Sequence, residues 1–263
     1  MDVLMNEKFS GKVEVERVEN QLLPNIKITR HISFEELVKS TAYDMIGDPS
    51  EDITIAYLKC GAISLSSIKN PTKPMCLAAV SHDGCALRYV TNQDDEICVA
   101  ALNSNGLALE YVSMQTDELC LVAVKQDGMA IKLIPDPTAA MCIIAVRQNG
   151  YALKYIKDQT IDICMEAIKQ NGLALQYAVE QNEEMCLTAV KQMGWVLQFV
   201  KEQTPDMCIE AIRQNWRNLT YARKQSRQLC KMAIWSDRFA LHYVNSVFMR
   251  IYLTFSLRLY IIE

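Results

Sequence analysis

Eight of the ten cysteines in this chain recur at a fixed interval of 22 residues. Thiols at a regular spacing could bind a metal ion or carry redox chemistry. Equivalent residues of stacked helical repeats, however, lie about 8 to 10 Å apart, whereas a disulfide needs Cα atoms about 4.4 to 6.8 Å apart. A zinc-bound sulfur lies about 2.3 Å from its metal. We therefore expect no metal and no cofactor, and we interpret these thiols as small buried hydrophobic groups packed against alanine. The series consists of Cys76, Cys98, Cys120, Cys142, Cys164, Cys186, Cys208 and Cys230.

The remaining reactive side chains do not form a catalytic set. Cys60 and Cys85 lie off the 22-residue interval and are the two thiols that we would test for reactivity. The three histidines, His31, His82 and His242, are far apart in the sequence, and no glycine-rich phosphate loop is present. The carboxylates fall where helices are expected to begin. The sequence names no catalytic residue, and we expect a protein that is not an enzyme.

The cysteine interval belongs to a longer repeated pattern. An alanine follows each of these cysteines by three residues, and a glycine follows by eight in the first six copies, before Trp216 and Arg238 take that position. Four residues before each cysteine stands a residue of a type that caps a helix N-terminus. These capping residues are Thr72, Asp94, Thr116, Thr138, Thr160, Asn182, Thr204 and Ser226. The pattern predicts one helix beginning after each capping residue.

One copy, at residues 160–178, illustrates the expected geometry. Cys164, Ala167 and their neighbours Ile163 and Ile168 recur at helical spacing and predict a buried face. The glycine of each copy is expected to end this helix in the left-handed conformation. Short helices are marginal alone, so neighbouring units must stack and share a core.

A second, shorter helix is expected after the glycine. In the same copy, Ala174, Leu175 and Ala178 would face inward, with Tyr177 beside them. We predict that the repeated tyrosines belong to the core, with their hydroxyls at its rim. The tyrosines are Tyr89, Tyr111, Tyr155, Tyr177, Tyr221 and Tyr243. The predicted fold is an all-α solenoid of short antiparallel helix pairs; a strand-containing leucine-rich repeat is the alternative, but it needs a strict two-residue alternation.

The ends of the chain differ from its middle. Residues 1–53 are predicted to form an N-terminal cap, in which 12–18 and 25–32 alternate like a small β-hairpin and 33–46 open with a capping box. The helical repeat array is predicted to span residues 54–245.

Two segments of this organisation are less regular. Residues 54–75 keep the apolar register but lose the cysteine, and are interpreted as a decayed first repeat in which the glycine moves to Gly61. Residues 246–263 are predicted to form a C-terminal capping helix, with a membrane-surface helix as the alternative. Their apolar stretch is too short, and carries too many arginines, for a membrane span.

Composition and charge exclude several classes of protein. The net charge of −4 argues against a surface that is basic throughout, but residues 207–263 hold nine basic and only three acidic residues. The N-terminus has no apolar segment typical of a signal peptide, so we expect reduced thiols and a cytoplasmic location.

One position of the repeat varies while its neighbours stay constant. The residue after the glycine changes in size and chemistry from copy to copy, which is typical of a surface that meets different demands. Tyr151, Trp195 and Phe239 stand at this position and are the predicted partner-binding residues. Packing between repeats is the alternative role for these three rings.

Basic residues suggest a second surface. One set, at the predicted helix C-termini, could bind an anionic partner but is better explained as a complement to the helix dipole: Lys125, Arg147, Lys169, Lys191 and Arg213. A C-terminal basic patch has fewer acidic neighbours and could bind an acidic partner or nucleic acid. It comprises Arg213, Arg217, Arg223, Lys224, Arg227 and Lys231.

The repeat also carries a resemblance to a known family. The segments "DELCLVAVKQDGMAIKL" at 117–133 and "DICMEAIKQNGLALQY" at 162–177 share Cys, Ala, Gly and Tyr at the same offsets as the family pattern. They resemble an uncharacterised repeat family, a domain of unknown function, from amoeba-infecting giant viruses (relatives of Mimivirus) and amoeba-associated bacteria. The resemblance covers about residues 70–245, with departures at Trp216 and Arg238 that put the last two turns in doubt. It implies no reaction, but it implies a viral or bacterial source and an amoebal host cell.

From these observations we expect a non-catalytic repeat scaffold of viral origin that binds a viral or host protein, in the host cytoplasm or the virion. The alternative is a virion structural or nucleic-acid-associated protein that uses the basic C-terminal patch.

Overall fold

The computed structural model describes residues 49–247, 249–251 and 253–254. The chain divides into two compact units, residues 1–104 and 105–263, which are described separately. The hairpin and helix predicted within residues 1–46 lie outside the described residues, as do the last nine residues of the predicted C-terminal capping helix. Residues 247, 249–251 and 253–254 are helical.

In the described part of the first unit, α-helices pack in chain order, α3 on α4 and α4 on α5. Gly61 follows α3 with a φ of 71°, and its N–H donates to the Leu58 carbonyl at 3.1 Å. The elements are α3 (Glu51–Lys59), η2 (Leu65–Ser67), α4 (Lys73–His82), η3 (Gly84–Tyr89) and α5 (Asp95–Ser104), where η denotes a 3₁₀ helix.

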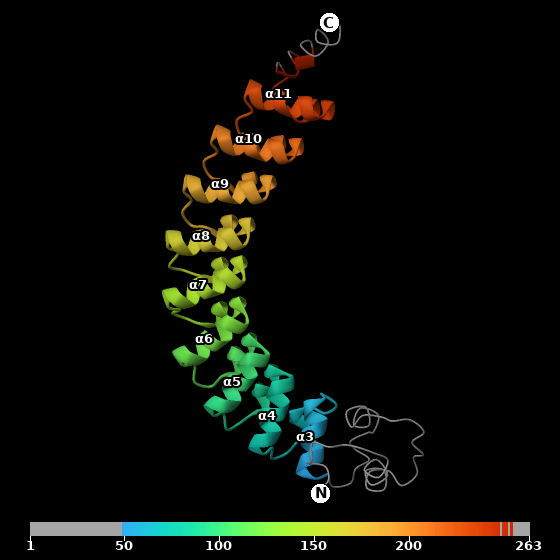
Figure 1. The fold of residues 1–263 in the computed structure, drawn as a ribbon, viewed down its shortest axis with the longest axis vertical. Coiled ribbons are helices and arrows are strands. Elements are labelled where there is room, and N and C mark those ends of the chain that lie inside the picture. The colour runs from blue at the N-terminus through green and yellow to red at the C-terminus, as the bar shows by residue number, and fades with distance from the viewer. Residues whose placement is uncertain (1–48, 248, 252, 255–263) are drawn as a thin grey trace, which may run out of the picture. The chain divides into compact units, whose positions relative to one another are not determined.

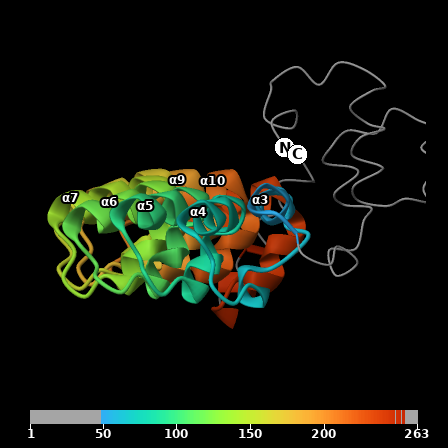
Figure 2. The same ribbon diagram turned by 90° about the horizontal axis from the view of Figure 1, so that it is seen from below.

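In the second unit, the α-helices α6 to α11 lie side by side in chain order (Figure 1). The 3₁₀ helices between them also pack on one another, so the unit has an α layer and a 3₁₀ layer (Figure 2). The prediction of an all-α solenoid of helix pairs is confirmed. The elements are η4 (Gly106–Tyr111), α6 (Asp117–Gln126), η5 (Gly128–Leu133), α7 (Ala139–Gln148), η6 (Gly150–Tyr155), α8 (Ile161–Gln170), η7 (Gly172–Tyr177), α9 (Glu183–Gln192), η8 (Gly194–Phe199), α10 (Pro205–Gln214), η9 (Trp216–Tyr221), α11 (Arg227–Ser236) and η10 (Arg238–Tyr243).

The predicted caps begin the α-helices, with one exception. The side chain of Thr160, for example, accepts a hydrogen bond from the Ile163 N–H at 3.3 Å, and the other predicted caps from Asp94 onward do the same. Thr72 does not cap its helix; its hydroxyl lies 2.5 Å from Glu51 Oε1 instead. The capped N-termini fix where each α-helix starts.

The predicted apolar face of the α-helices is also confirmed. In α8, Ile163, Cys164, Ala167 and Ile168 are at most 3% exposed. The small cysteine and alanine side chains let the neighbouring helix approach closely, because neither projects far from its backbone. The core of each repeat therefore lies between the α layer and the 3₁₀ layer, where Leu175 and its equivalents are also buried.

From η3 onward, the second helix of each pair is a six-residue 3₁₀ helix. Its N-cap in most copies is the Asn or Asp that precedes the glycine: Asn171, for example, accepts from the Leu173 N–H at 3.0 Å. Trp216 and Arg238 in the glycine position do not alter this geometry, because η9 and η10 have the same length and are capped by Asn215 and Asp237. The doubt that the sequence raised about these two turns is resolved.

The role predicted for the repeated glycines was wrong. Among the described residues, Gly61 is the glycine with a positive φ, so the others do not end the α-helices in the left-handed conformation. They begin the 3₁₀ helices, and in the second unit each faces the carbonyl oxygen of an alanine in the next repeat. A Cβ at Gly106 would lie 2.4 Å from the Ala123 oxygen, and one at Gly150 would lie 2.6 Å from the Ala167 oxygen. Glycine is needed here for the close approach of two backbones.

The prediction that the repeated tyrosines are core residues was also wrong for several of them. Tyr89, Tyr155 and Tyr243 are 39 to 42% exposed. These rings lie at the end of the 3₁₀ helix, where its residues turn toward the solvent. The buried side chains of that helix are instead its alanine and the leucine that follows, such as Ala174 and Leu175.

The two edges of the second unit are each crossed by a row of glutamines that the sequence analysis overlooked. We call the junction between each α-helix and the following 3₁₀ helix the glycine edge. There, the Gln170 side chain accepts from the Gly150 N–H at 2.7 Å, and Gln192 accepts likewise from Gly172. The same side chains donate back to carbonyls of the preceding α-helix. The row comprises Gln126, Gln148, Gln170, Gln192 and Gln214.

We call the connection between each 3₁₀ helix and the next α-helix the loop edge. There, the Gln181 amide donates to the carbonyls of Leu175 and Phe199, and its oxygen accepts from the Lys201 N–H at 2.9 Å. One side chain thus bonds two successive repeats. The row comprises Gln159, Gln181, Gln203 and Gln225.

The glycine contacts predict a graded effect on stability. Replacing Gly106, Gly150 or Gly172 with alanine adds a Cβ that would lie 2.4, 2.6 or 3.0 Å from the facing oxygen. Because overpacking costs about 1 to 3 kcal/mol, we expect Gly106→Ala to destabilise most and Gly172→Ala least, measured as urea midpoints by circular dichroism. Equal losses, or the reverse order, would show that the contact is not the reason for glycine.

Candidate protein-binding surface

The three aromatic residues predicted to bind a partner all lie on the glycine edge, each as the second residue of a 3₁₀ helix. Tyr151 lies in η6, Trp195 in η8 and Phe239 in η10, so they occupy alternate repeats. Leu173 and Arg217 hold the repeats between them. Tyr151 is half-buried, whereas Trp195 is 39% and Phe239 69% exposed.

The three aromatic residues differ in the rings that they contact. The Tyr151 ring packs edge-on against Tyr177 of the next repeat, with centroids 6.2 Å apart, which is what the packing alternative expects. Trp195 meets Phe199 and Phe239 meets His242, both within their own 3₁₀ helix. Trp195 and Phe239 therefore present more ring surface to a partner than Tyr151 does.

The structure does not bring the predicted basic patch together. Arg213 and Arg217 lie on the glycine edge, at the C-terminal end of α10 and the start of η9, whereas Arg223, Lys224 and Arg227 lie on the loop edge. A helix of ten residues such as α10 is about 15 Å long, which separates the two groups. Lys231 is half-buried within α11. The six residues are close in sequence but belong to opposite edges.

Aromatic and basic side chains do gather on the glycine edge of the last repeats. Arg217 lies over the Trp216 ring, with its guanidinium carbon 4.6 Å from the centroid, which is a cation–π contact. Trp235, at the end of α11, is 73% exposed. Trp216 itself is half-buried and packs edge-on against Tyr243 of the next repeat, with centroids 5.4 Å apart. We call the exposed residues of this edge the aromatic–basic surface: Trp195, Arg213, Arg217, Trp235 and Phe239.

Trp235 was missed by the sequence analysis, although a signal was present. It stands 22 residues after Arg213, at the position that carries Lys or Arg in the five preceding repeats. An exposed tryptophan that replaces a cation breaks the pattern in the direction of lower solubility. Such a departure is typical of a contact surface.

The basic row at the α-helix C-termini is partly neutralised. Glu166 lies 2.6 Å from the Arg147 side chain and 3.1 Å from Lys169 Nζ. Hydrogen bonds from Arg147 and Lys169 lower the pKa of this carboxyl. All five members of the row are exposed, so surface ion pairs of this kind contribute little to stability.

The repeated cysteines are buried, and burial raises the pKa of each of their thiols, that of Cys186 to about 11. A thiol held in its protonated form is a poor nucleophile and metal ligand. Cys60 and Cys85 are half-buried, and the Cys60 thiol donates to the Tyr57 carbonyl at 3.3 Å. In the described part of the chain, no three His, Cys, Asp or Glu residues are grouped as a metal ion would require.

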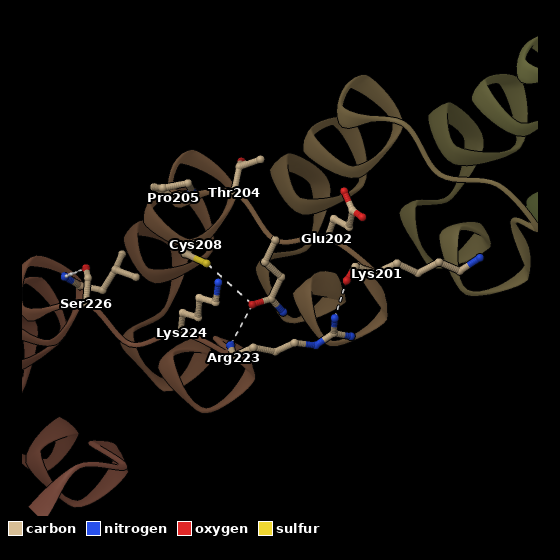
Figure 3. Close-up of a pocket in the computed structure, with 10 residues that line it drawn as sticks. Lys201, Glu202, Thr204, Pro205, Cys208, Arg223, Lys224 and Ser226 are labelled. Carbon is tan, nitrogen blue, oxygen red and sulfur yellow. Dashed lines mark hydrogen bonds between the residues drawn. The ribbon is translucent and has the colours of Figure 1, made fainter.

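A groove of about 510 Å³ opens on the loop edge between α10 and α11 (Figure 3). Lys201, Thr204 and Lys224 are among its lining residues. At its floor the Cys208 thiol and the Arg223 N–H both donate to the Gln203 side-chain oxygen. Gln203 therefore links α10 to the connection that follows η9 along this groove.

Comparison with known families adds to this picture. Four overlapping segments match the family described as "Domain of unknown function (DUF4116)": residues 73–116, 94–137, 141–181 and 160–204. This part of the chain is similar to that family. Each matched segment spans close to two of the 22-residue units, so the family pattern is a pair of repeats. No curated protein and no solved structure matches the chain. Among the described residues, no helix combines the length and the apolar character that a membrane crossing requires.

The buried thiols predict a dependence of stability on alkaline pH. An unfolded cysteine loses its proton around pH 9, whereas folded Cys186 holds it to about pH 11. Its contribution to the free energy of unfolding is therefore complete below pH 9 and is lost as the pH rises to 11. We expect the stability of Cys186→Ala to fall less steeply than that of the wild type across this range, measured by urea unfolding. Parallel pH profiles would contradict this assignment.

Proposed function

We propose that this chain is a non-catalytic repeat scaffold that binds another protein through the aromatic–basic surface. The observation that carries this proposal is the exposure of Trp235 and Phe239 on the same edge as Arg213 and Arg217. Tryptophan and arginine dominate the binding energy of protein interfaces. Large exposed rings on the same edge as arginine side chains are typical of a contact surface.

The chemistry of the surface defines the partner. Exposed rings require apolar side chains opposite them, and the guanidinium groups of Arg213 and Arg217 require carboxylates. We therefore propose a protein partner that presents acidic and apolar side chains along one segment. A viral or host protein, met in the cytoplasm of an infected amoebal cell or in a virion, is the partner that we would test first.

The repeat geometry supports a role in recognition. Core positions and glutamine rows leave few side chains free to vary, and the residue after the glycine is one of them. Variation along one edge of a rigid row lets the protein meet an extended partner at several points, as other repeat proteins do. The raised thiol pKa values support a function without cysteine chemistry.

Loss of the rings is expected to abolish partner capture. We expect a variant with Trp195, Trp235 and Phe239 changed to alanine to recover a partner from amoebal lysate at least about tenfold less well than the wild type, since hot-spot residues each contribute about 2 kcal/mol or more. A matched control changes the exposed apolar residues Met114, Ile161 and Val179, which lie elsewhere on the second unit. Equal recovery by both variants would exclude the aromatic–basic surface as the binding site.

Nucleic acid is the alternative partner, because arginine and tryptophan side chains can also stack on unpaired bases. The aromatic–basic surface is small and the chain is acidic overall, so we expect weak binding of single-stranded RNA in a filter assay. A dissociation constant that rises steeply with salt, and binding that is lost in an Arg213→Ala, Arg217→Ala variant, would favour the nucleic-acid function over the protein one.

A further inference from the structure

The glutamine row on the loop edge is interrupted at one position within the array. Between residues 93 and 225, every 22nd residue is glutamine except residue 137, which is Pro137. At Gln159, Gln181, Gln203 and Gln225 the side chain makes similar contacts to the next repeat each time. Gln159, for example, donates to the carbonyls of Leu153, Ile156 and Tyr177, while its oxygen accepts from the Val179 N–H at 2.9 Å and from a buried thiol.

Proline at position 137 leaves the corresponding groups without this partner. By the same offsets, these are the carbonyls of Ile131 and Tyr155, the N–H of Lys157 and the thiol of Cys142. The pyrrolidine ring has neither a donor nor an acceptor in its side chain. Pro135 affects the preceding repeat instead, because it stands where later repeats have the N–H that bonds to the preceding glutamine, which here is Gln115.

A second observation shows that the space of the missing side chain is open. Three residues before this position, each repeat has an aliphatic residue. Ile134 is half-buried, as is Ile68 beside Pro71, which stands at the same position of an earlier unit. The equivalents in repeats with glutamine are all buried: Val90, Val112, Ile156, Ala178, Val200 and Ala222.

A groove of about 450 Å³ lies at this place, and the groove of about 510 Å³ between α10 and α11 is its counterpart in a repeat that keeps its glutamine, Gln203. Ile134, Pro137, Cys142, Tyr155 and Lys157 are among the residues that line it. The groove therefore combines a half-buried aliphatic side chain with Tyr155 and Lys157, whose counterparts in later repeats bond to a glutamine through their backbone.

We propose that this groove binds the glutamine side chain of an extended segment of a partner protein. The carboxamide would donate to the carbonyls of Ile131 and Tyr155 and accept from the Lys157 N–H, as the chain's own glutamines do elsewhere. Its methylene groups would cover Ile134. A glutamate cannot donate to the two carbonyls, and a lysine cannot accept from the N–H, so the groove selects a group that does both.

An extended segment suits the site because the groove is open along the loop edge. Lys132, Lys157, Asp136 and Asp158 line its sides, where they would meet the residues that flank the bound glutamine. The site is on the opposite edge from the aromatic–basic surface, so it stands or falls independently of that surface.

The test uses the full chain and a capped tripeptide, acetyl-Ala-Gln-Ala-amide, followed by the ¹⁵N–¹H resonance of Lys157. The amide protons of Val179, Lys201, Arg223 and Asn245, which already bond to a glutamine, provide the reference for the bound state. We expect the peptide to move the Lys157 proton downfield toward that reference, saturating at millimolar concentration. The matching Glu peptide is expected to bind at least about tenfold more weakly.

Two variants show whether the missing carboxamide is what creates the site. Pro137→Gln restores the segment Asp-Gln-Thr seen in the next repeat and is expected to shift Lys157 without peptide and to abolish peptide binding. Pro137→Ala removes the ring but supplies no amide, and is expected to bind the Gln peptide as the wild type does. An unmoved Lys157 resonance in the wild type, equal binding of the Glu peptide, or binding retained by Pro137→Gln would each overturn the proposal.

Discussion

Hydrogen bonding between a glutamine side chain and the backbone of the neighbouring repeat is the interaction on which this structure depends. Helices satisfy their own backbone groups, so stacked helices have few backbone bonds left with which to fix their register. Here Gln170 reaches the N–H of Gly150, and Gln181 joins Leu175 to Phe199. Such bonds have direction, whereas packing of cysteine and alanine alone would tolerate sliding. The glutamines convert a non-directional core into a repeat of fixed geometry.

The glycine edge shows how the same constraint determines residue type. Gly150 must donate its N–H to Gln170 and also lie against the Ala167 carbonyl, and a Cβ would prevent the second contact. The side chain of the following residue points away from this contact and is free to vary. The scaffold places the weakest demand on side-chain type at this position, which Trp195 and Phe239 occupy. Variation of residue type at this position therefore indicates that packing does not restrict it. Variation alone does not indicate a binding site.

Much of the repeat could be predicted, because caps and apolar spacing are local properties of the chain. Thr160 and Ile163 could be assigned from their neighbours alone. The role of Gly172 could not, since glycine suits both a left-handed turn and a close contact, and only the position of the next repeat distinguishes them. The predicted basic patch is divided for a related reason: Arg213 and Arg223 are ten residues apart in the sequence, but they lie at opposite ends of η9 and so on opposite edges. The exposure of Trp235 could have been predicted from the sequence, because this tryptophan stands where the five preceding repeats have Lys or Arg.

Breaks in an otherwise regular pattern have more than one physical outcome in this chain. Asn218 replaces the buried alanine of the 3₁₀ helix, and its amide is satisfied internally by the Ala211 carbonyl at 2.8 Å, so that break is repaired within the fold. Pro137 removes an amide, and Ile134 is left half-buried. A repeat protein can bind at such unrepaired positions because its own sequence elsewhere specifies the missing group. The glutamine of the regular repeats is thus the group that we propose for the ligand at Pro137. This proposal is independent of what binds the aromatic–basic surface.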